Sequence, residues 1–142
     1  MPEMRTGERK GFDFPEAKKR LKDLENLGDL DGHELVAMAR AIGQKIVRSV
    51  SASQIYKFHE HIVRYATSVE AKRAEVRNVK LLSYHLAYAA ARIRKNEERD
   101  LMKELAEFLD VALDKVKTMQ DLARLRQLSE AIVAYHKFFG GR

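Results

Sequence analysis

Proline is nearly absent from this chain, and apolar residues recur every three or four positions along most of it. The only two prolines, Pro2 and Pro15, both precede the periodic part of the sequence, so no later residue lacks the backbone N–H that a helix needs. No stretch alternates between apolar and polar residues for long enough to form a strand, and no hairpin-type turn joins two apolar runs. The sequence therefore predicts an all-α fold, a compact bundle of five or six helices.

Capping residues and apolar stripes locate the expected helices. In chain order, these helices begin near Pro15, Asp31, Ser51, Val79, Leu101 and Thr118. Three of the starts carry a capping pair, in which a Ser, Thr or Asp is followed three residues later by a second polar side chain. We expect the first helix to end at Gly28 and the fourth to run through Ile93. In the sixth helix, Tyr135 and Phe139 belong to the stripe that should face inward.

Length and composition favour one domain with a short extension. The chain has 142 residues, a usual size for a single domain. Residues 1–12 lack periodicity and carry several basic residues, so we expect a flexible basic N-terminal arm there and a helical-bundle domain over residues 13–142. The absence of cysteine excludes disulfides and thiolate metal sites, and no apolar run is long enough to span a membrane. We expect a cytoplasmic protein with no membrane partner.

The sequence lacks the patterns that carry catalysis. None of the five histidines has another histidine or an acid three or four residues away within the same expected helix, the spacing that two helical ligands of one metal require. Glycine-rich phosphate loops and serine-nucleophile motifs are also absent. We therefore expect no catalytic residue, no metal site and no cofactor, and we expect the histidines at the surface or at interfaces. The sequence indicates a protein that is not an enzyme.

Basic residues on the third expected helix and near it point to an anionic partner. The formal net charge is +6, which favours such a partner without identifying it. Lys57, His61 and Arg64 share a stripe that lies about 140° around the third helix from its apolar face. Basic side chains bind the phosphates of nucleic acids. The candidate residues for this contact are Lys45, Arg48, Lys57, Arg64 and Arg92.

A second stripe, on the fourth expected helix, combines tyrosine with arginine. The members of this stripe share one helix face, and they are Arg77, Tyr84, Tyr88, Arg92 and Lys95. Tyrosine can stack on the bases of RNA or bond to its sugar hydroxyls, and it can equally pack against a neighbouring helix. Both interpretations of the two tyrosines stay open at this point.

Three segments resemble elements of a known family. Residues 53–58 (SQIYKF) resemble a Ser/Thr-Gln-Ile-Arg-Lys-Phe element, and residues 81–92 (LLSYHLAYAAAR) resemble Leu-Leu-x-Pro-Lys-Leu-Ala-Tyr-Ala-Ala-x-Arg. Residues 130–141 (EAIVAYHKFFGG) are similar, almost residue for residue, to a Glu-Ala-Ile-Val-Ala-Tyr-His-Lys-Phe-Tyr-Gly-Gly ending. All three elements occur, in this order, in the small subunit of the type III-A CRISPR–Cas effector (Csm) complex. The chain departs from the family's basic residues at Tyr56 and at Tyr84-His85. If either basic residue touches RNA in relatives, that contact would be altered or lost in this chain.

The resemblance implies a non-catalytic subunit of an RNA-guided antiviral complex. In that family several copies stack head to tail as an inner filament, against the guide-carrying backbone subunits and beneath the large polymerase-domain subunit. The filament contacts guide RNA and target RNA along the backbone without sequence specificity, which would make the five candidate residues RNA-binding. Apart from the resemblance, terminal helices of small bundles can exchange between copies, and such an exchange would make the isolated subunit a dimer.

Other interpretations fit a basic helical bundle. The small subunit of the related type III-B complex is of similar size, but the ending over residues 130–141 argues against it. A helical adaptor that binds only protein would use its positive charge for solubility. A nuclease is disfavoured because no acid–histidine or carboxylate cluster stands out in the sequence.

Overall fold

Six α-helices and two short 3₁₀ segments make up the secondary structure of residues 12–142, the part of the chain that the computed structural model describes, and no strand occurs there. The α-helices are, in chain order, α2 (Phe14–Lys22), α3 (Gly32–Ile46), α4 (Ala52–Glu70), α5 (Leu82–Ala91), α6 (Asn96–Asp114) and α7 (Met119–Phe138). The 3₁₀ segments are η1 (Leu27–Asp29) and η2 (Val76–Leu81). The predicted all-α bundle is confirmed. The predicted N-terminal arm lies outside the described residues, apart from Phe12.

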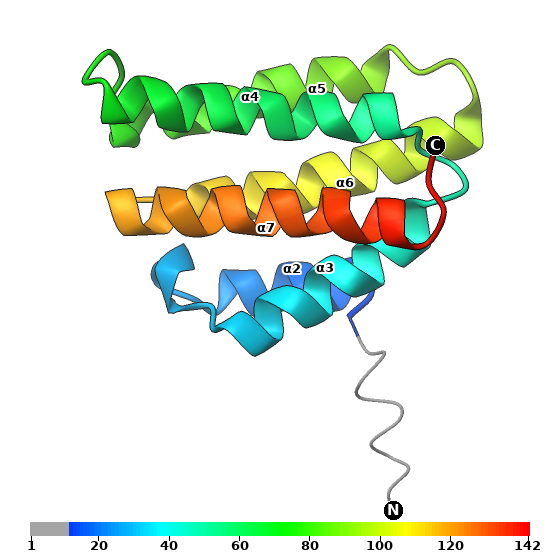
Figure 1. The fold of residues 1–142 in the computed structure, drawn as a ribbon, viewed down its shortest axis with the longest axis horizontal. Helices are drawn as coiled ribbons and strands as arrows, with labels where there is room; N and C mark the ends of the chain where they lie inside the picture. The colour runs from blue at the N-terminus through cyan, green and yellow to red at the C-terminus, as the bar shows by residue number, and fades with distance from the viewer. Residues whose placement is uncertain (1–11) are drawn as a thin grey trace, which may run out of the picture.

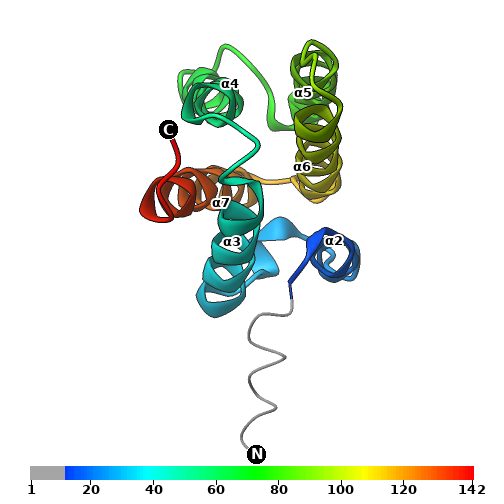
Figure 2. The same ribbon diagram turned by 90° about the vertical axis from the view of Figure 1, so that its right-hand side faces the viewer.

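The helices pack in three layers. α4 and α5 form one outer layer, α6 and α7 form the middle layer, and α2 and α3 form the other outer layer (Figure 1). In the view along the helices, α7 lies between α3 and α4, and α6 lies between α2 and α5 (Figure 2). The middle layer is formed by the last two helices of the chain. α6 packs against α2 and α7 packs against α3, so helices that are far apart in the sequence lie side by side.

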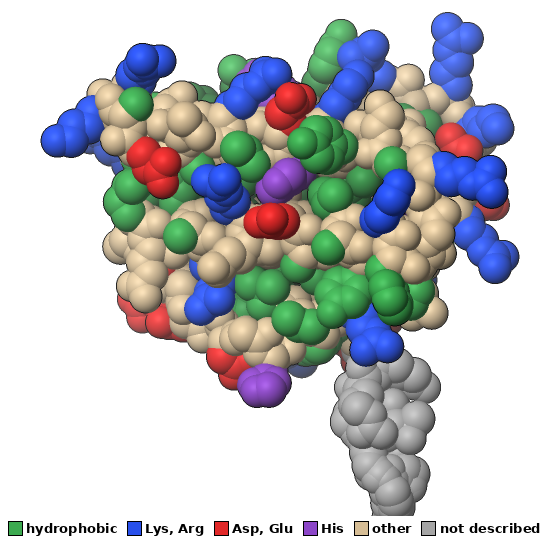
Figure 3. Space-filling model, in the orientation of Figure 1, with side chains coloured by type: hydrophobic (Ala, Val, Ile, Leu, Met, Phe, Trp, Pro, Cys, Tyr) green, Lys and Arg blue, Asp and Glu red, His purple; other side chains and the backbone are tan. Residues whose placement is uncertain are grey.

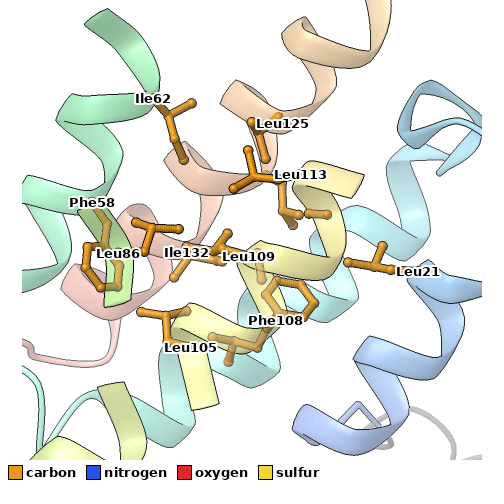
Figure 4. Packing of buried hydrophobic residues seen from close by; sticks show 14 of the residues in the cluster. Leu21, Phe58, Ile62, Leu86, Leu105, Phe108, Leu109, Leu113, Leu125 and Ile132 are labelled. Atoms are coloured by element: carbon orange, nitrogen blue, oxygen red, sulfur yellow. The ribbon is translucent and has the colours of Figure 1, made fainter. Parts of the chain in front are cut away.

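The middle layer carries the centre of the hydrophobic core. Leu105 and Phe108 of α6 lie close to Ile132 of α7 in the interior (Figure 4), and all three are almost completely buried. Phe14 of α2 meets Phe108 edge to face with ring centroids 6.4 Å apart, an arrangement that aromatic rings favour. Phe58 of α4 closes the core from the opposite layer. Both outer layers therefore depend on the middle layer for burial.

Side-chain caps fix where several helices begin. Asp13, Ser51 and Thr118 each accept a hydrogen bond from the backbone N–H three residues later, and the side chain of that residue binds back to the cap. Asp31 caps α3 by accepting from the N–H of Glu34 at 2.8 Å. Such caps satisfy N–H groups that have no partner within the first helical turn. The predicted starts at Asp31, Ser51 and Thr118 are confirmed.

The predicted end of the first helix is wrong. α2 ends at Lys22 rather than at Gly28. The N–H of Leu27 donates to the carbonyl of Lys115 at 2.9 Å, so it cannot take part in a continuing helix, and the chain forms η1 instead. A contact with a residue far along the chain therefore keeps the helix from continuing through Leu27 to Gly28, although the apolar spacing continues through Leu24.

The fourth and fifth helices also differ from their predicted bounds. The segment expected to be helical from Val79 begins as η2, and α5 ends at Ala91, so Ile93 lies beyond the helix while staying buried. α6 begins at Asn96, earlier than the expected start at Leu101. The first turn of α6 is largely exposed, which accounts for its polar residues. Its acidic residues lie at the N-terminal end of the helix, where the positive end of the helix dipole stabilises them.

The inward face of α7 differs from the predicted stripe. Tyr135 and Phe139 are only partly buried, whereas Ser129 and His136 are buried. The reason is that α7 packs against helices on two sides, so its buried surface is wider than one stripe. His136 is 1% exposed, against our expectation of a surface or interfacial histidine. Its Nε2 atom lies 2.6 Å from the carbonyl oxygen of Val50, and this hydrogen bond allows the polar ring to be buried.

Candidate nucleic-acid interface

Two open hollows adjoin beside the N-terminal end of α4. Their volumes are about 500 Å³ and about 430 Å³, and Gln54 and Glu98 line both of them. We define the basic groove by the cationic residues of the two linings, which are Arg48, Lys57, Arg92, Arg94, Lys95 and Arg142. Among the described residues that line the groove, only Glu98 is acidic. Lys and Arg side chains gather along the corresponding right-hand edge of the molecule in Figure 3.

The capping box of α4 sets one wall of the groove. The N–H of Ser51 donates to the side chain of Gln54 at 2.7 Å, and the N–H of Gln54 donates to the Ser51 hydroxyl at 3.1 Å. This reciprocal pair fixes the direction in which α4 starts. Lys57 follows one turn later and is exposed, while its neighbour Phe58 is buried. α4 thus presents the Lys57 ammonium group to solvent, and the buried Phe58 beside it fixes the position of the helix.

The connection between α5 and α6 sets the other wall. The N–H of Ile93 donates to the carbonyl of Ala90 at 3.2 Å, and the Ile93 side chain is buried. This anchor leaves Arg92 and Arg94 exposed on both sides of it. Lys95 follows, and its ammonium group lies 3.9 Å from a carboxylate oxygen of Glu98 with most of the Lys95 side chain in solvent. An exposed pair at this distance is weak, so Lys95 remains able to bind another anion.

Residues 140–142, which we call the strap, fold back beside the start of α4. The N–H of Gly141 donates to the carbonyl of His136 at 2.8 Å, and the N–H of Ala52 donates to the carbonyl of Arg142 at 3.0 Å. A Cβ on Gly141 would lie 2.1 Å from the His136 ring, so no side chain fits there. Gly140 has a φ of +97°, a conformation that favours glycine. The two glycines therefore bring Arg142 into the basic groove.

The structure brings together three of the five candidate residues. Arg48, Lys57 and Arg92 line the basic groove. Arg64 is exposed farther along α4, where it pairs at 3.5 Å with a glutamate one turn earlier. Lys45 is exposed in the last turn of α3. Neither Arg64 nor Lys45 belongs to the lining of the groove.

Sequence reasoning missed Arg94 and Arg142 as members of the site, and it placed Lys95 on the stripe of Tyr84, Tyr88 and Arg92 without counting it among the five candidates. The expected fourth helix ran through Ile93, and a helical register would have sent successive side chains in different directions. The chain leaves the helix at Ala91, and the link to α6 then exposes Arg94 and Lys95 together. The run of basic residues around Ile93 was the available signal. Arg142 joins the groove only through the fold of the strap.

Aromatic side chains cover the outer face of α5. Tyr84 is 61% exposed and Tyr88 is 67% exposed, so within residues 12–142 neither tyrosine is covered by a neighbouring helix. The ring of His85 stacks on Tyr84 with centroids 4.5 Å apart, and on its other neighbour, His61 of α4, at 5.0 Å. The guanidinium carbon of Arg92 lies 5.6 Å from the centre of the Tyr88 ring. These rings form an ordered surface next to the basic groove.

The positive charge near this surface rests on Lys and Arg rather than on His61. Burial lowers the pKa of His61, and the neighbouring His85 and Arg64 lower it further, while Glu60 acts in the opposite direction. Because an ordinary histidine has a pKa of about 6.5, the His61 ring is mostly neutral at pH 7. Protonation of this ring requires more acidic conditions or a nearby anion.

Within residues 12–142, no three His, Asp or Glu side chains are arranged to hold a metal ion. No helix in that part of the chain is long and apolar enough to cross a membrane. The residues that line the basic groove offer positive charge and N–H donors, which bind the oxygens of phosphates.

A comparison with protein families supports the resemblance seen in the sequence. The model of the family described as Csm2 Type III-A matches residues 29–142, which include α3 to α7 and every residue of the basic groove. No curated protein and no solved structure matches the chain. Because the family match covers well over half of the sequence, this protein belongs to the Csm2 type III-A family and is a small structural subunit of the type III-A CRISPR Csm complex, with the other Csm subunits as its partners.

Proposed function

We propose that this small subunit is not catalytic and that it holds guide RNA and target RNA by their phosphates, without reading their sequence, during antiviral interference in the cytoplasm. Several copies stack head to tail as an inner filament. The filament lies against the guide-carrying backbone subunits and beneath the large polymerase-domain subunit. The family to which the chain belongs supports this arrangement.

The convergence of basic side chains in the groove is the observation that carries the proposal. The α3–α4 turn, α4, the α5–α6 link and the strap each contribute to the groove, although they lie far apart in the sequence. Lys and Arg neutralise RNA phosphates and displace the counterions condensed on them. Glu98, the acid in the lining, is already next to Lys95. A groove of this composition attracts a polyanion.

The RNA-binding residues of the proposal fall into two groups. Arg48, Lys57 and Arg92 act within the groove, together with the cations that the structure adds to it. Lys45 and Arg64 lie outside the groove and are exposed, and we assign them to more distant phosphates of the same strand. Contacts to phosphates position a protein on RNA but carry no sequence information. Binding through these residues is therefore independent of sequence.

An exposed phenylalanine at the end of α7, packed against two partly buried aromatic rings, supports self-association. Phe138 is 71% exposed, and its ring lies 5.2 Å from that of Phe139 and 6.1 Å from that of Tyr135, centre to centre. An exposed aromatic ring that caps a cluster of partly buried ones is typical of a protein–protein interface. In the complex this cluster meets a neighbouring copy of the chain. The same surface would join two copies in a dimer of the isolated subunit.

A protein-only adaptor is the second candidate, because the Phe138 cluster alone would serve it. The two candidate functions predict different effects of neutralising the basic groove. The adaptor uses the groove's charge only for solubility, whereas an RNA-holding subunit loses its function when the groove is neutralised. The family match is to a type III-A subunit, which argues against the type III-B small subunit.

Filter binding of two unrelated single-stranded RNAs across a series of salt concentrations tests the proposal. We expect both RNAs to bind with equal affinity, and log K to fall with log salt at a slope of about −0.7 for each phosphate neutralised. Neither RNA should be cleaved when magnesium or manganese is added. A flat salt response with a strong preference for one sequence would contradict the backbone contact. No binding at low salt would favour the adaptor.

A further inference from the structure

The outer face of α5 is more aromatic than its packing requires. Leu82, Leu86 and Ala90 bury the inner face of the helix. Tyr84 and Tyr88 each lie about 160° around the helix from Leu86, and both are mostly exposed. Large rings on a free helix face add nothing to the core of this chain. They therefore call for a partner outside the described part of the fold.

The rings on this face are already ordered by one another. His85 is stacked between His61 and Tyr84, with interplanar angles of 22° and 29°. Arg92 lies over the ring of Tyr88. A flat ligand that adds to such a stack would fix fewer side chains than one that binds to mobile rings, so less conformational entropy is lost on binding.

The charges around this face select an anionic partner. α5, with the sequence LSYHLAYAAA, contains no acidic residue. Arg92, which follows the two tyrosines on the same stripe, also lines the basic groove. A strand whose phosphates lie in the groove therefore meets Arg92, which lies over the ring of Tyr88. Single-stranded RNA offers both components, a line of phosphates and flat bases with exposed faces.

We propose that Tyr84 and Tyr88, with His85 supporting the ring of Tyr84 from within the stack, form a stacking platform for unpaired bases of the RNA whose phosphates lie in the basic groove. The inference rests on the proposed RNA-binding function and adds a second kind of contact to it. Every base has a π face, so stacking of this kind tolerates any sequence. The platform favours unpaired over paired RNA, because bases within a duplex are already stacked on one another.

The test compares two strands of equal length and charge, an oligouridine and an abasic oligonucleotide with the same number of phosphates. We expect the wild-type chain to bind oligouridine more tightly, by about five- to a hundredfold for each stacked base. The double variant Tyr84→Leu, Tyr88→Leu should lose this preference and keep the wild-type affinity for the abasic strand. Leucine preserves apolar bulk without a π face, and both positions are exposed, so the melting temperature should stay near that of wild type.

Two matched variants complete the test. Tyr84→Phe with Tyr88→Phe retains the rings and should retain the preference for bases. Tyr56→Leu removes a tyrosine that is 55% exposed on α4 but outside the platform, and it should change nothing. A strand that carries 2-aminopurine supplies a direct signal, because stacking quenches its fluorescence. Quenching should occur with wild type and with the phenylalanine variant but not with the leucine variant.

The outcomes separate the platform from the phosphate contact. If wild type binds both strands equally, with a steep salt dependence, the platform is wrong while the proposed function stands. If wild type binds neither strand at low salt, both are wrong. If the leucine variant keeps its preference for bases but no longer self-associates, the tyrosines form a protein interface instead, and the stacking platform is overturned.

Discussion

The carboxylate of Asp121, at the start of α7, accepts a hydrogen bond at 2.8 Å from the backbone N–H of Gly28, which precedes it by 93 residues. The same carboxylate accepts from the side chain of Asn26 at 2.7 Å and from the N–H groups of Lys117 and Thr118 at 2.9 and 3.0 Å. Asp121 is buried. It thus joins the connection between α2 and α3 to the cap of α7.

Replacing Asp121 with Asn should lower the free energy of unfolding by about 2–3 kcal/mol, because buried N–H donors then face an amide that carries donors of its own. Chemical denaturation followed by circular dichroism measures this loss. Asp29→Asn changes an exposed acid in the same connection and should alter stability by less than about 0.5 kcal/mol.

The loss of stability in the Asp121→Asn variant should also depend on pH. Burial alone would raise the pKa of Asp121, but the hydrogen bonds from Lys117, Asn26, Gly28 and Thr118 outweigh it and hold the pKa below its usual value. A lowered pKa in the folded state contributes stability that is present above the unfolded pKa of about 3.9 and is lost as the pH falls through the folded value. The advantage of wild type over Asp121→Asn should therefore be constant above about pH 5 and decline below about pH 4. An equal difference at pH 7 and pH 2 would contradict this assignment.

Gly141→Ala should disturb the strap and the basic groove together. The added Cβ would overlap the His136 ring, so the strap has to move away from Ala52 and carries Arg142 with it. We expect a loss of about 1–3 kcal/mol in stability and weaker binding of RNA in filter assays. Gly32→Ala is the matched control, because a Cβ there meets no atom within 4 Å. Undiminished RNA binding by a destabilised Gly141→Ala chain would show that Arg142 does not contact RNA.

Reversing two charges within the groove should abolish most RNA binding while the fold is retained. Lys57→Glu with Arg92→Glu alters exposed side chains from opposite walls, so each change should cost no more than about 0.5 kcal/mol. The slope of log K against log salt should become shallower by about 1.4 if each residue neutralises one phosphate. Lys19→Glu with Lys22→Glu makes the same change of net charge on α2, in the opposite outer layer. An equal loss in both double variants would mean that net charge alone governs binding.

Lys45 and Arg64 should matter less than the residues of the groove. Both are exposed but lie outside its lining, and Arg64 already has a carboxylate partner in α4. Lys45→Glu with Arg64→Glu should therefore weaken RNA retention by a smaller factor than Lys57→Glu with Arg92→Glu under the same salt conditions. A larger effect would move the main path of the RNA away from the groove and along the length of α4.

Substitution of two phenylalanines by alanine should separate the stability of the fold from self-association. Phe58→Ala empties a buried position in the core and should cost about 3–5 kcal/mol. Phe138→Ala removes an exposed ring at the end of α7 and should leave the melting temperature almost unchanged while it weakens self-association, as measured by sedimentation. If Phe138→Ala associates as well as wild type does, the contact between copies lies on another surface.

The sequence predicted those parts of the fold that depend on neighbouring residues. The starts of α3, α4 and α7 follow from Asp31, Ser51 and Thr118, because a cap and its partner lie within one turn of each other. That the first helix does not continue to Gly28 was not predictable in this way, because Leu27 there forms a hydrogen bond with the distant Lys115. The burial of His136 likewise requires the carbonyl of Val50, which no local pattern indicates.

In the candidate site, too, the sequence predicted the features that depend on neighbouring residues and missed those that depend on distant ones. The helical stripe correctly placed Lys57 and Arg64 on the exposed side of α4, but the stripe could not distinguish the residue that lines the groove from the one that does not. That distinction depends on where the α5–α6 link passes, and so on the end of α5 at Ala91. Arg142 was missed because its place depends on the strap.

The position of α7 between α3 and α4 has a consequence for synthesis. A ribosome makes α3 and α4 long before it makes α7, and until then the apolar faces that these helices turn toward α7 have no cover. The nascent chain up to Asp114 therefore exposes much of the surface that later becomes the core, and such surface promotes aggregation. Folding of this subunit should be completed only after α7 has emerged, and a ribosome that stalls between α6 and α7 should leave a nascent chain that depends on chaperones.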